Sequence, residues 1–182
     1  MEMPKSRSLV DRMRGAALLD AATYDEVEHD QSATGQAAVV VGIVALASAI
    51  GAYRYGGRGI LGSIIAAFLG WLIWSGITYL IGTRVFKGTA TWGEMLRTLG
   101  FAQSPGVLLI LAIIPFLGVL ISFVVGIWTL ICGVIAIRQA LDLDTGKAVI
   151  TAILAWLTIL LITFVLSAVG LGVPGMGMRG AV

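Results

Sequence analysis

Charged segments alternate along the chain with long uncharged stretches that are rich in apolar residues. The uncharged stretches cover residues 35–53, 60–83, 98–136 and 148–178. A transmembrane helix needs about 20 consecutive apolar residues, because each residue adds 1.5 Å across a hydrocarbon core of about 30 Å. The pattern therefore predicts an all-α protein, a polytopic bundle of transmembrane helices.

The stretch 98–136 decides the number of spans. A single helix of this length would extend nearly 60 Å, at about 1.5 Å per residue, and would be about twice as long as the core is thick. Pro115 and Gly118 lie near its middle, in the sequence IIPFLG, and interrupt the helix. We therefore expect two spans here, at about 99–116 and 118–138, and five spans in total.

The basic residues predict an orientation. With five spans, nine of the twelve Lys and Arg residues fall on the side of the N-terminus and three on the opposite side. A single span over 98–136 would divide them eight to four. The positive-inside rule then places the N-terminus in the cytoplasm and the C-terminus outside, for a multi-pass protein of the cytoplasmic (inner) membrane.

Residues 1–34 are rich in charge and form the expected cytoplasmic N-terminal segment. Leu9, Met13 and Ala16 share one helical face, and Ser8 followed by Asp11 is typical of a helix start. We expect a short amphipathic interfacial helix on the membrane surface, with a loose cytosolic tail as the alternative. The five-span domain would follow at 35–173, and a flexible C-terminal tail at 174–182.

Composition narrows the functional class. Hydrophobic residues make up 58% of the 182 residues and charged residues only 12%, about half the charged fraction of a soluble domain. A net charge of +2 is too small to indicate a polyanion, so a nucleic-acid partner is excluded and membrane lipid is the expected surrounding. One cysteine cannot form an internal disulfide.

Catalytic chemistry is missing from the expected spans. They carry no ionisable group of the kind that proton relays and ion-coupled transporters use. His29 is the single histidine and lies in the N-terminal segment, so neither an intramembrane protease site nor paired haem ligands can be assembled. We expect a protein that is not an enzyme, with no catalytic residue, metal or cofactor.

An acidic cluster precedes the first span. It could bind a metal, but acids before a helix also favour its positive N-terminal end, and Asp30 or Ser32 could cap the first span. Capping is the interpretation that we favour. The cluster comprises Asp25, Glu26, Glu28, His29 and Asp30. In the same way, Asp144 and Thr145 are expected to cap the fifth helix.

Small residues recur every four positions in the second span, at Gly62, Ala66 and Gly70. Such a ridge lets two helix backbones approach closely in lipid. It therefore predicts a helix–helix interface, either within one tightly packed monomer or with a second copy or another membrane protein.

The sequence GFAQSPG places Gln103, Ser104 and Pro105 at the expected start of the third span. Proline lacks a backbone N–H and restrains the residue before it, so we expect the helix to be broken or to start late. Two interpretations stay open: a small polar pocket facing the cytoplasm, and a plain helix start at the interface. Trp71, Trp74 and Trp128 are expected to be packing residues, with an aromatic-lined pocket as the alternative.

Three segments together resemble a known family. They are WGEMLRTLGFAQSPG at 92–106, IIPFLG at 113–118 and IRQALDLDTGKA at 137–148. Their order and spacing are similar to those of the Yip (Ypt/Rab-interacting) family of five-span membrane proteins. The resemblance implies a cytoplasmic N-terminus, and for eukaryotic members a role as membrane adaptors that contact prenylated small GTPases. The D-L-Y-G-P motif of that branch is absent, so the chain looks like a prokaryotic-type member.

We therefore expect a non-enzymatic adaptor or scaffold for a membrane or cytoplasmic partner. An accessory structural subunit of a larger respiratory or photosynthetic complex is one alternative. A lipid or small-solute carrier that uses the 103–105 break is another. The N-terminal segment would form the partner-facing surface together with the basic residues Arg84, Lys87, Arg97, Arg138 and Lys147.

Overall fold

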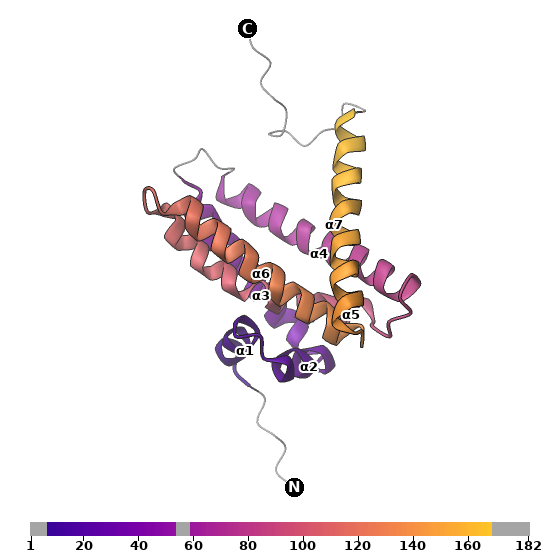
Figure 1. The fold of residues 1–182 in the computed structure, drawn as a ribbon. Coiled ribbons are helices and arrows are strands. Elements are labelled where there is room, and N and C mark those ends of the chain that lie inside the picture. The colour runs from indigo at the N-terminus through magenta and orange to yellow at the C-terminus, as the bar shows by residue number, and fades with distance from the viewer. Residues whose placement is uncertain (1–6, 54–58, 169–182) are drawn as a thin grey trace.

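The computed structural model describes residues 7–53 and 59–168, which contain helices and no strand (Figure 1). Two short helices, α1 (Leu9–Ala17) and α2 (Ala21–His29), precede the spans. The spans are α3 (Ala33–Gly51), α4 (Ile60–Arg84), α5 (Trp92–Ala102) continued by the 3-10 helix η2 (Ser104–Ile113), α6 (Gly118–Ala140) and α7 (Thr145–Ala168).

Five helical segments are long and apolar enough to cross a membrane, which confirms the five-span prediction. Pro115 lies in the turn between η2 and α6, as expected, and Phe116 beside it has a left-handed backbone with φ 66°. The predicted C-terminal tail at 174–182 lies outside the described residues.

The third span differs from the prediction. It begins at Trp92 rather than near residue 99, because Thr91 and Glu94 form a complete capping box at its N-terminus. The α-helix changes to a 3-10 helix after Gln103, where the Gly106 N–H donates to the Gln103 carbonyl at 2.8 Å. The expected break at Pro105 is therefore confirmed, whereas the expectation that the span starts there is wrong.

This change of helix type also lengthens the span. Eleven α-helical residues at 1.5 Å and ten 3-10 residues at about 2.0 Å extend about 36 Å together. The broken segment is therefore long enough to cross the core.

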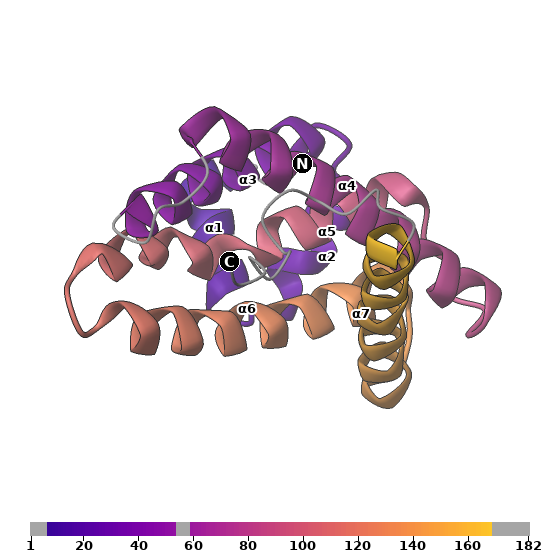
Figure 2. The same cartoon turned by 90° about the horizontal axis from the view of Figure 1, so that it is seen from above.

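The third span lies at the centre of the bundle, between α3 and α6 (Figure 2). Within its most apolar stretch 61% of the residues are buried, against 11% in α4 and in α7. Because it begins at Trp92, it includes Glu94 and Arg97. The expectation that no span contains an ionisable group is therefore wrong for the third span.

Small residues pack α3 against the third span. A Cβ added at Gly100 would lie 2.7 Å from the Ala37 Cβ, and one at Gly106 would lie 2.5 Å from the Val44 Cγ1. A Cβ at Gly51 would collide with the Leu109 carbonyl oxygen. Small residues therefore let α3 pack closely on both α5 and η2.

The ridge predicted on α4 has different surroundings. Gly62 and Gly70 are exposed and Ala66 is half-buried. A Cβ added at Gly70 would have no described neighbour within 4 Å. Within residues 7–53 and 59–168, the ridge therefore lies on the outer surface of the bundle.

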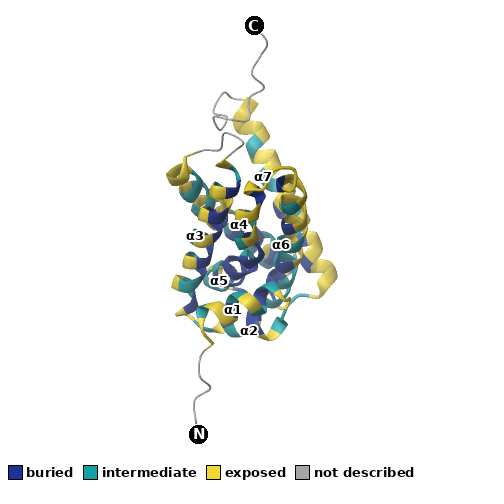
Figure 3. Cartoon of the chain, turned by 90° about the vertical axis from the view of Figure 1, so that its left-hand side faces the viewer, coloured by how far each residue is buried: buried dark blue, intermediate teal, exposed yellow. Residues whose placement is uncertain are grey.

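Helices α1 and α2 pack against one end of the bundle. The Trp128 Nε1 donates to the Ala17 carbonyl at 2.7 Å, and the Tyr24 hydroxyl donates to the Ala16 carbonyl at 3.0 Å. Figure 3 shows buried residues inside the bundle and where α2 meets it. The apolar face predicted for the first helix thus contacts protein, and residues 9–29 are folded, contrary to the alternative of a loose tail.

Candidate functional site

Arg12 holds the two N-terminal helices together. It is 1% exposed, and its Nε and Nη2 donate to Glu26 Oε1 at 3.0 and 2.8 Å. The Nη2 also donates to Asp30 Oδ2 at 2.6 Å, and the Nη1 donates to Gln36 Oε1 at 3.0 Å. Hydrogen bonds from Ser32 and Arg12 lower the pKa of Asp30 below its usual value. One guanidinium thus joins α1, α2 and the start of α3.

Arg97 joins α2 to the third span. Its Nε donates to the carbonyl oxygens of Val27 at 2.9 Å and Glu28 at 3.1 Å, and its Nη2 also donates to Glu28. These carbonyls belong to the last turn of α2, where the helix leaves acceptors unpaired and favours a cation. Because Arg97 is only 6% exposed, the expectation that it lies on the partner-facing surface is corrected.

The other four predicted basic residues lie at the ends of the spans on the same side of the bundle as α1 and α2. Arg84, Lys87 and Lys147 are exposed, and Arg138 is half-buried with its Nε 3.3 Å from the Gln139 Oε1. Among the described residues, only Lys147 of these four has an ion pair, with Asp144 at 3.2 Å. The Lys147 N–H donates to Asp144 Oδ1 at 3.0 Å, which confirms the expected cap of the fifth helix.

The acidic cluster divides into two groups. Glu26 and Asp30 pair with Arg12, whereas ligand atoms of Asp25, Glu28 and His29 lie within 4.8 Å of one another. Burial raises the pKa of Glu28 to about 7.

Capping before the first span is confirmed only in part. Asp30 Oδ1 accepts hydrogen bonds from the Ser32 N–H at 2.9 Å and from the Ser32 hydroxyl at 2.6 Å. Ser32 is the N-cap residue of α3, yet its side chain makes no capping bond to the helix.

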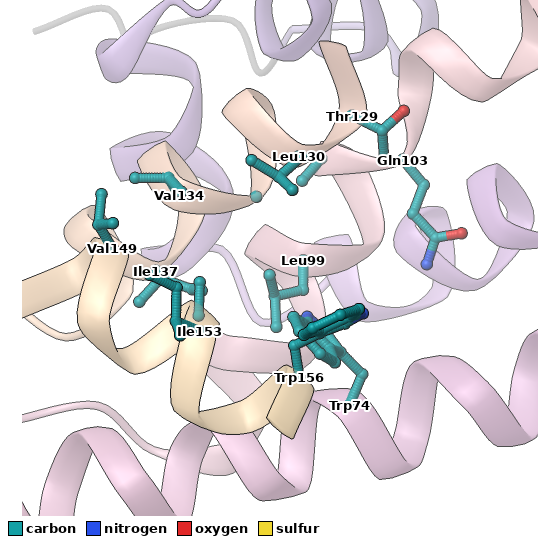
Figure 4. A pocket seen from close by; sticks show the side chains of 13 residues that line it. Trp74, Leu99, Gln103, Thr129, Leu130, Val134, Ile137, Val149, Ile153 and Trp156 are labelled. Atoms are coloured by element: carbon teal, nitrogen blue, oxygen red, sulfur yellow. The ribbon is translucent and has the colours of Figure 1, made fainter. Parts of the chain in front are cut away.

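A cavity of about 520 Å³ lies between α4, α5, α6 and α7 (Figure 4). Its two polar lining side chains are Gln103 and Thr129, and two indoles, Trp74 and Trp156, lie at another side of it. The aliphatic part of the lining includes Leu99, Leu130, Val134, Ile137, Val149 and Ile153. Among the residues that the structure describes, none with a charged side chain lines the cavity.

The three residues of the predicted polar break have different positions. Gln103 lines the cavity, whereas Ser104 and Pro105 are buried between spans. The Ser104 hydroxyl donates to the Phe101 carbonyl at 2.6 Å, so it satisfies the backbone where the helix changes type. Of the three, only Gln103 is placed to meet a ligand in this cavity.

The tryptophans divide between packing and cavity. The Trp71 Nε1 donates to the Leu96 carbonyl at 3.0 Å, and Trp128 bonds α1 as described above, so both are packing residues as expected. Trp74 lines the cavity with Trp156, which sequence analysis did not single out. Only the packing of α7 against α4 brings these two side chains to one site.

A comparison with protein families matched a family model described as Yip1 domain to residues 19–167. Comparisons with curated proteins and with solved structures gave no match. The matched range begins two residues after α1 and ends one residue before the end of α7, and so includes Arg97, the break at Gln103 and the cavity.

Proposed function

Since the chain belongs to the Yip1 domain family, as its sequence predicted, we propose that this multi-pass membrane protein acts as a non-enzymatic adaptor. We place the protein in the cytoplasmic (inner) membrane, with α1 and α2 on its cytoplasmic side. Without Arg97, which lies inside the third span, eight basic residues against three support this orientation.

The observation that carries the proposal is the attachment of α2 to the bundle. Arg12 of α1 forms ion pairs with Glu26 and Asp30, and Arg97 of α5 donates hydrogen bonds to the last turn of α2. A surface that is already ordered loses little conformational entropy when a partner binds. Helices α1 and α2 therefore offer a fixed docking surface.

Three basic side chains lie at the ends of spans on the same side of the bundle as α1 and α2. Arg84, Lys87 and Arg138 have no ion pair among the described residues, and they lie at the ends of α4 and α6 on the same side. Unpaired cations attract and orient an acidic partner segment. The proposed partner is therefore a cytoplasmic or membrane protein with an acidic contact region.

The orientation is tested by cysteine labelling. The single native cysteine, Cys132, is replaced by alanine, and one new cysteine is placed at Lys87 or at Phe116, which is fully exposed in the η2–α6 turn. A membrane-impermeant maleimide should label the Phe116 position on intact cells, and the Lys87 position only after the membrane is permeabilised. The reverse labelling pattern would contradict the orientation.

The adaptor role is tested by photo-crosslinking in cells. A crosslinking amino acid at Lys87 should give an adduct of one defined mass, and the same amino acid at Phe116 should not. The charge reversal Arg84→Glu should reduce the adduct severalfold. Equal adducts at Lys87 and Phe116, or none at Lys87, would refute a partner on this surface.

The exposed ridge on α4 favours a second candidate, an accessory subunit or a homo-oligomer. Gly62, Ala66 and Gly70 offer a face on which another transmembrane helix could pack closely. Gly70→Leu should then reduce the mass of the complex purified in mild detergent. Gly126→Leu, at another open glycine, is the matched control. An unchanged mass in Gly70→Leu would refute this interface.

A further inference from the structure

Four polar or aromatic side chains meet near the middle of their spans. Trp74, Gln103, Thr129 and Trp156 each lie ten or eleven residues from the end of the span on the α1–α2 side. They therefore lie at a similar level along their helices, about 15 Å from those ends at about 1.5 Å per residue. All four line the same cavity.

Two of these groups have unused hydrogen-bonding capacity. Neither the Gln103 amide nor the Thr129 hydroxyl bonds another residue of the described ranges. Other span threonines differ, since the hydroxyls of Thr78 and Thr151 donate to the carbonyl four residues earlier at 2.7 and 2.8 Å. An unpaired polar group in an apolar environment costs free energy, which a ligand with a suitable acceptor would offset.

Charge and the route of entry restrict the ligand. The lining formed by the described residues carries no charged side chain, so the ligand is uncharged. Exposed Leu130, Ile153 and Trp156 form the outer part of the lining, so entry is from the hydrocarbon phase. The ligand is therefore an uncharged molecule that enters from the hydrocarbon phase and carries a polar group for Gln103 or Thr129.

We propose that the cavity binds an uncharged lipophile with a carbonyl-bearing ring and a hydrocarbon tail, the chemistry of an isoprenoid quinone. A carbonyl oxygen accepts from the Gln103 amide or the Thr129 hydroxyl, and the ring packs near the indoles of Trp74 and Trp156. The tail contacts the aliphatic lining. A volume of about 520 Å³ lies within the range of small-molecule sites. This binding requires no cytoplasmic partner and goes beyond the adaptor role.

The first test fills the cavity. Gly133 lines it, and a Cβ added there would meet nothing within 4 Å, so the leucine of Gly133→Leu starts in open space at the cavity wall. Gly126→Leu on the same helix is the control, because Gly126 is equally open and is not part of the lining. Quenching of tryptophan fluorescence by decylubiquinone is titrated for the purified full chain in detergent. Saturable quenching should be lost in Gly133→Leu and kept in Gly126→Leu.

The second test removes the proposed donor. Gln103→Leu should weaken decylubiquinone binding about tenfold, as expected for one buried hydrogen bond, whereas Gln31→Leu at an exposed position should not. Decylbenzene, which has the ring and tail without carbonyls, should compete at least tenfold less well than decylubiquinone. Any one of four results would overturn the proposal. They are the absence of saturable binding to the wild type, equal affinities of Gly133→Leu and Gly126→Leu, equal competition by decylbenzene, and an unchanged affinity in Gln103→Leu.

Discussion

Replacing Arg12 with methionine tests whether the N-terminal helices are locked to the bundle. Methionine keeps an unbranched apolar stem but removes the guanidinium that bonds Glu26, Asp30 and Gln36. Breaking a fully buried ion pair by removing one partner costs about 3–5 kcal/mol. Because the side chains of Glu26 and Asp30 are still 28% and 27% exposed, water resolvates them in part. We expect a loss of about 2–3 kcal/mol, which raises the opening equilibrium of α1 and α2 about 30- to 160-fold.

Cys132 provides the assay. It is the single cysteine of the chain, it is fully buried, and its Sγ lies 3.5 Å from the Ala16 carbonyl oxygen of α1. A maleimide therefore reaches this thiol only after α1 has moved away, and the modification rate in detergent reports that opening. We expect the rate in Arg12→Met to rise by about 30-fold or more, with global helicity unchanged by circular dichroism.

The matched control is Arg14→Met, which removes an exposed arginine from the same helix. Its modification rate should stay within about threefold of wild type, since an exposed charge contributes little to stability. A rate in Arg12→Met that is equally close to wild type would refute the view that this buried ion pair holds the helices in place.

Three further predictions concern stability. Thr91→Ala removes the capping box of α5 and should lower the free energy of unfolding by about 1 kcal/mol, which lowers the melting temperature by about 3 °C. A change below about 1 °C would contradict the role of this cap. Gly51→Ala should lower the free energy of unfolding by about 2 kcal/mol or more, because the added Cβ meets the rigid Leu109 carbonyl. Gly126→Ala, the control, should not lower the melting temperature. Equal melting temperatures for the two variants would refute the close packing of α3 on η2. Since burial raises the pKa of Glu28 from 4.5 to about 7, the folded state binds a proton that the unfolded chain releases, so stability falls as pH rises through this window. In thermal unfolding, Glu28→Gln should reduce the fall of the melting temperature between pH 5 and 8, whereas the exposed-site control Asp25→Asn should keep that fall. An unchanged fall in Glu28→Gln would show that another group is responsible.

Some features followed from local sequence. The Pro115 turn, the Ser8 start of α1 and the Asp144 cap of α7 were predicted because each depends on residues within four positions of one another. The start of the third span was placed wrongly, near residue 99, since it was inferred from the uncharged stretch 98–136. The capping box at Thr91 was the local signal that could have placed it at Trp92.

The positions of individual side chains needed the tertiary structure. Arg97 was expected on the surface, but its guanidinium bonds carbonyls 69 and 70 residues away in the sequence. Gln103 was identified from the break at Pro105, whereas Thr129 and Trp156 became part of the site only through the packing of α6 and α7. No pattern along one helix specifies which of its faces meets a helix that is distant in sequence.

The sequence by itself determined that this protein is a five-span helical bundle. A charged side chain or an unpaired backbone in hydrocarbon costs several kcal/mol, so the uncharged stretches had to form membrane helices whatever they pack against. Only the tertiary structure decided that Arg12 and Arg97 fix the N-terminal helices, and that Gln103, Thr129 and two indoles surround one cavity. These arrangements depend on the rotation and mutual approach of helices, which close packing of particular small residues determines.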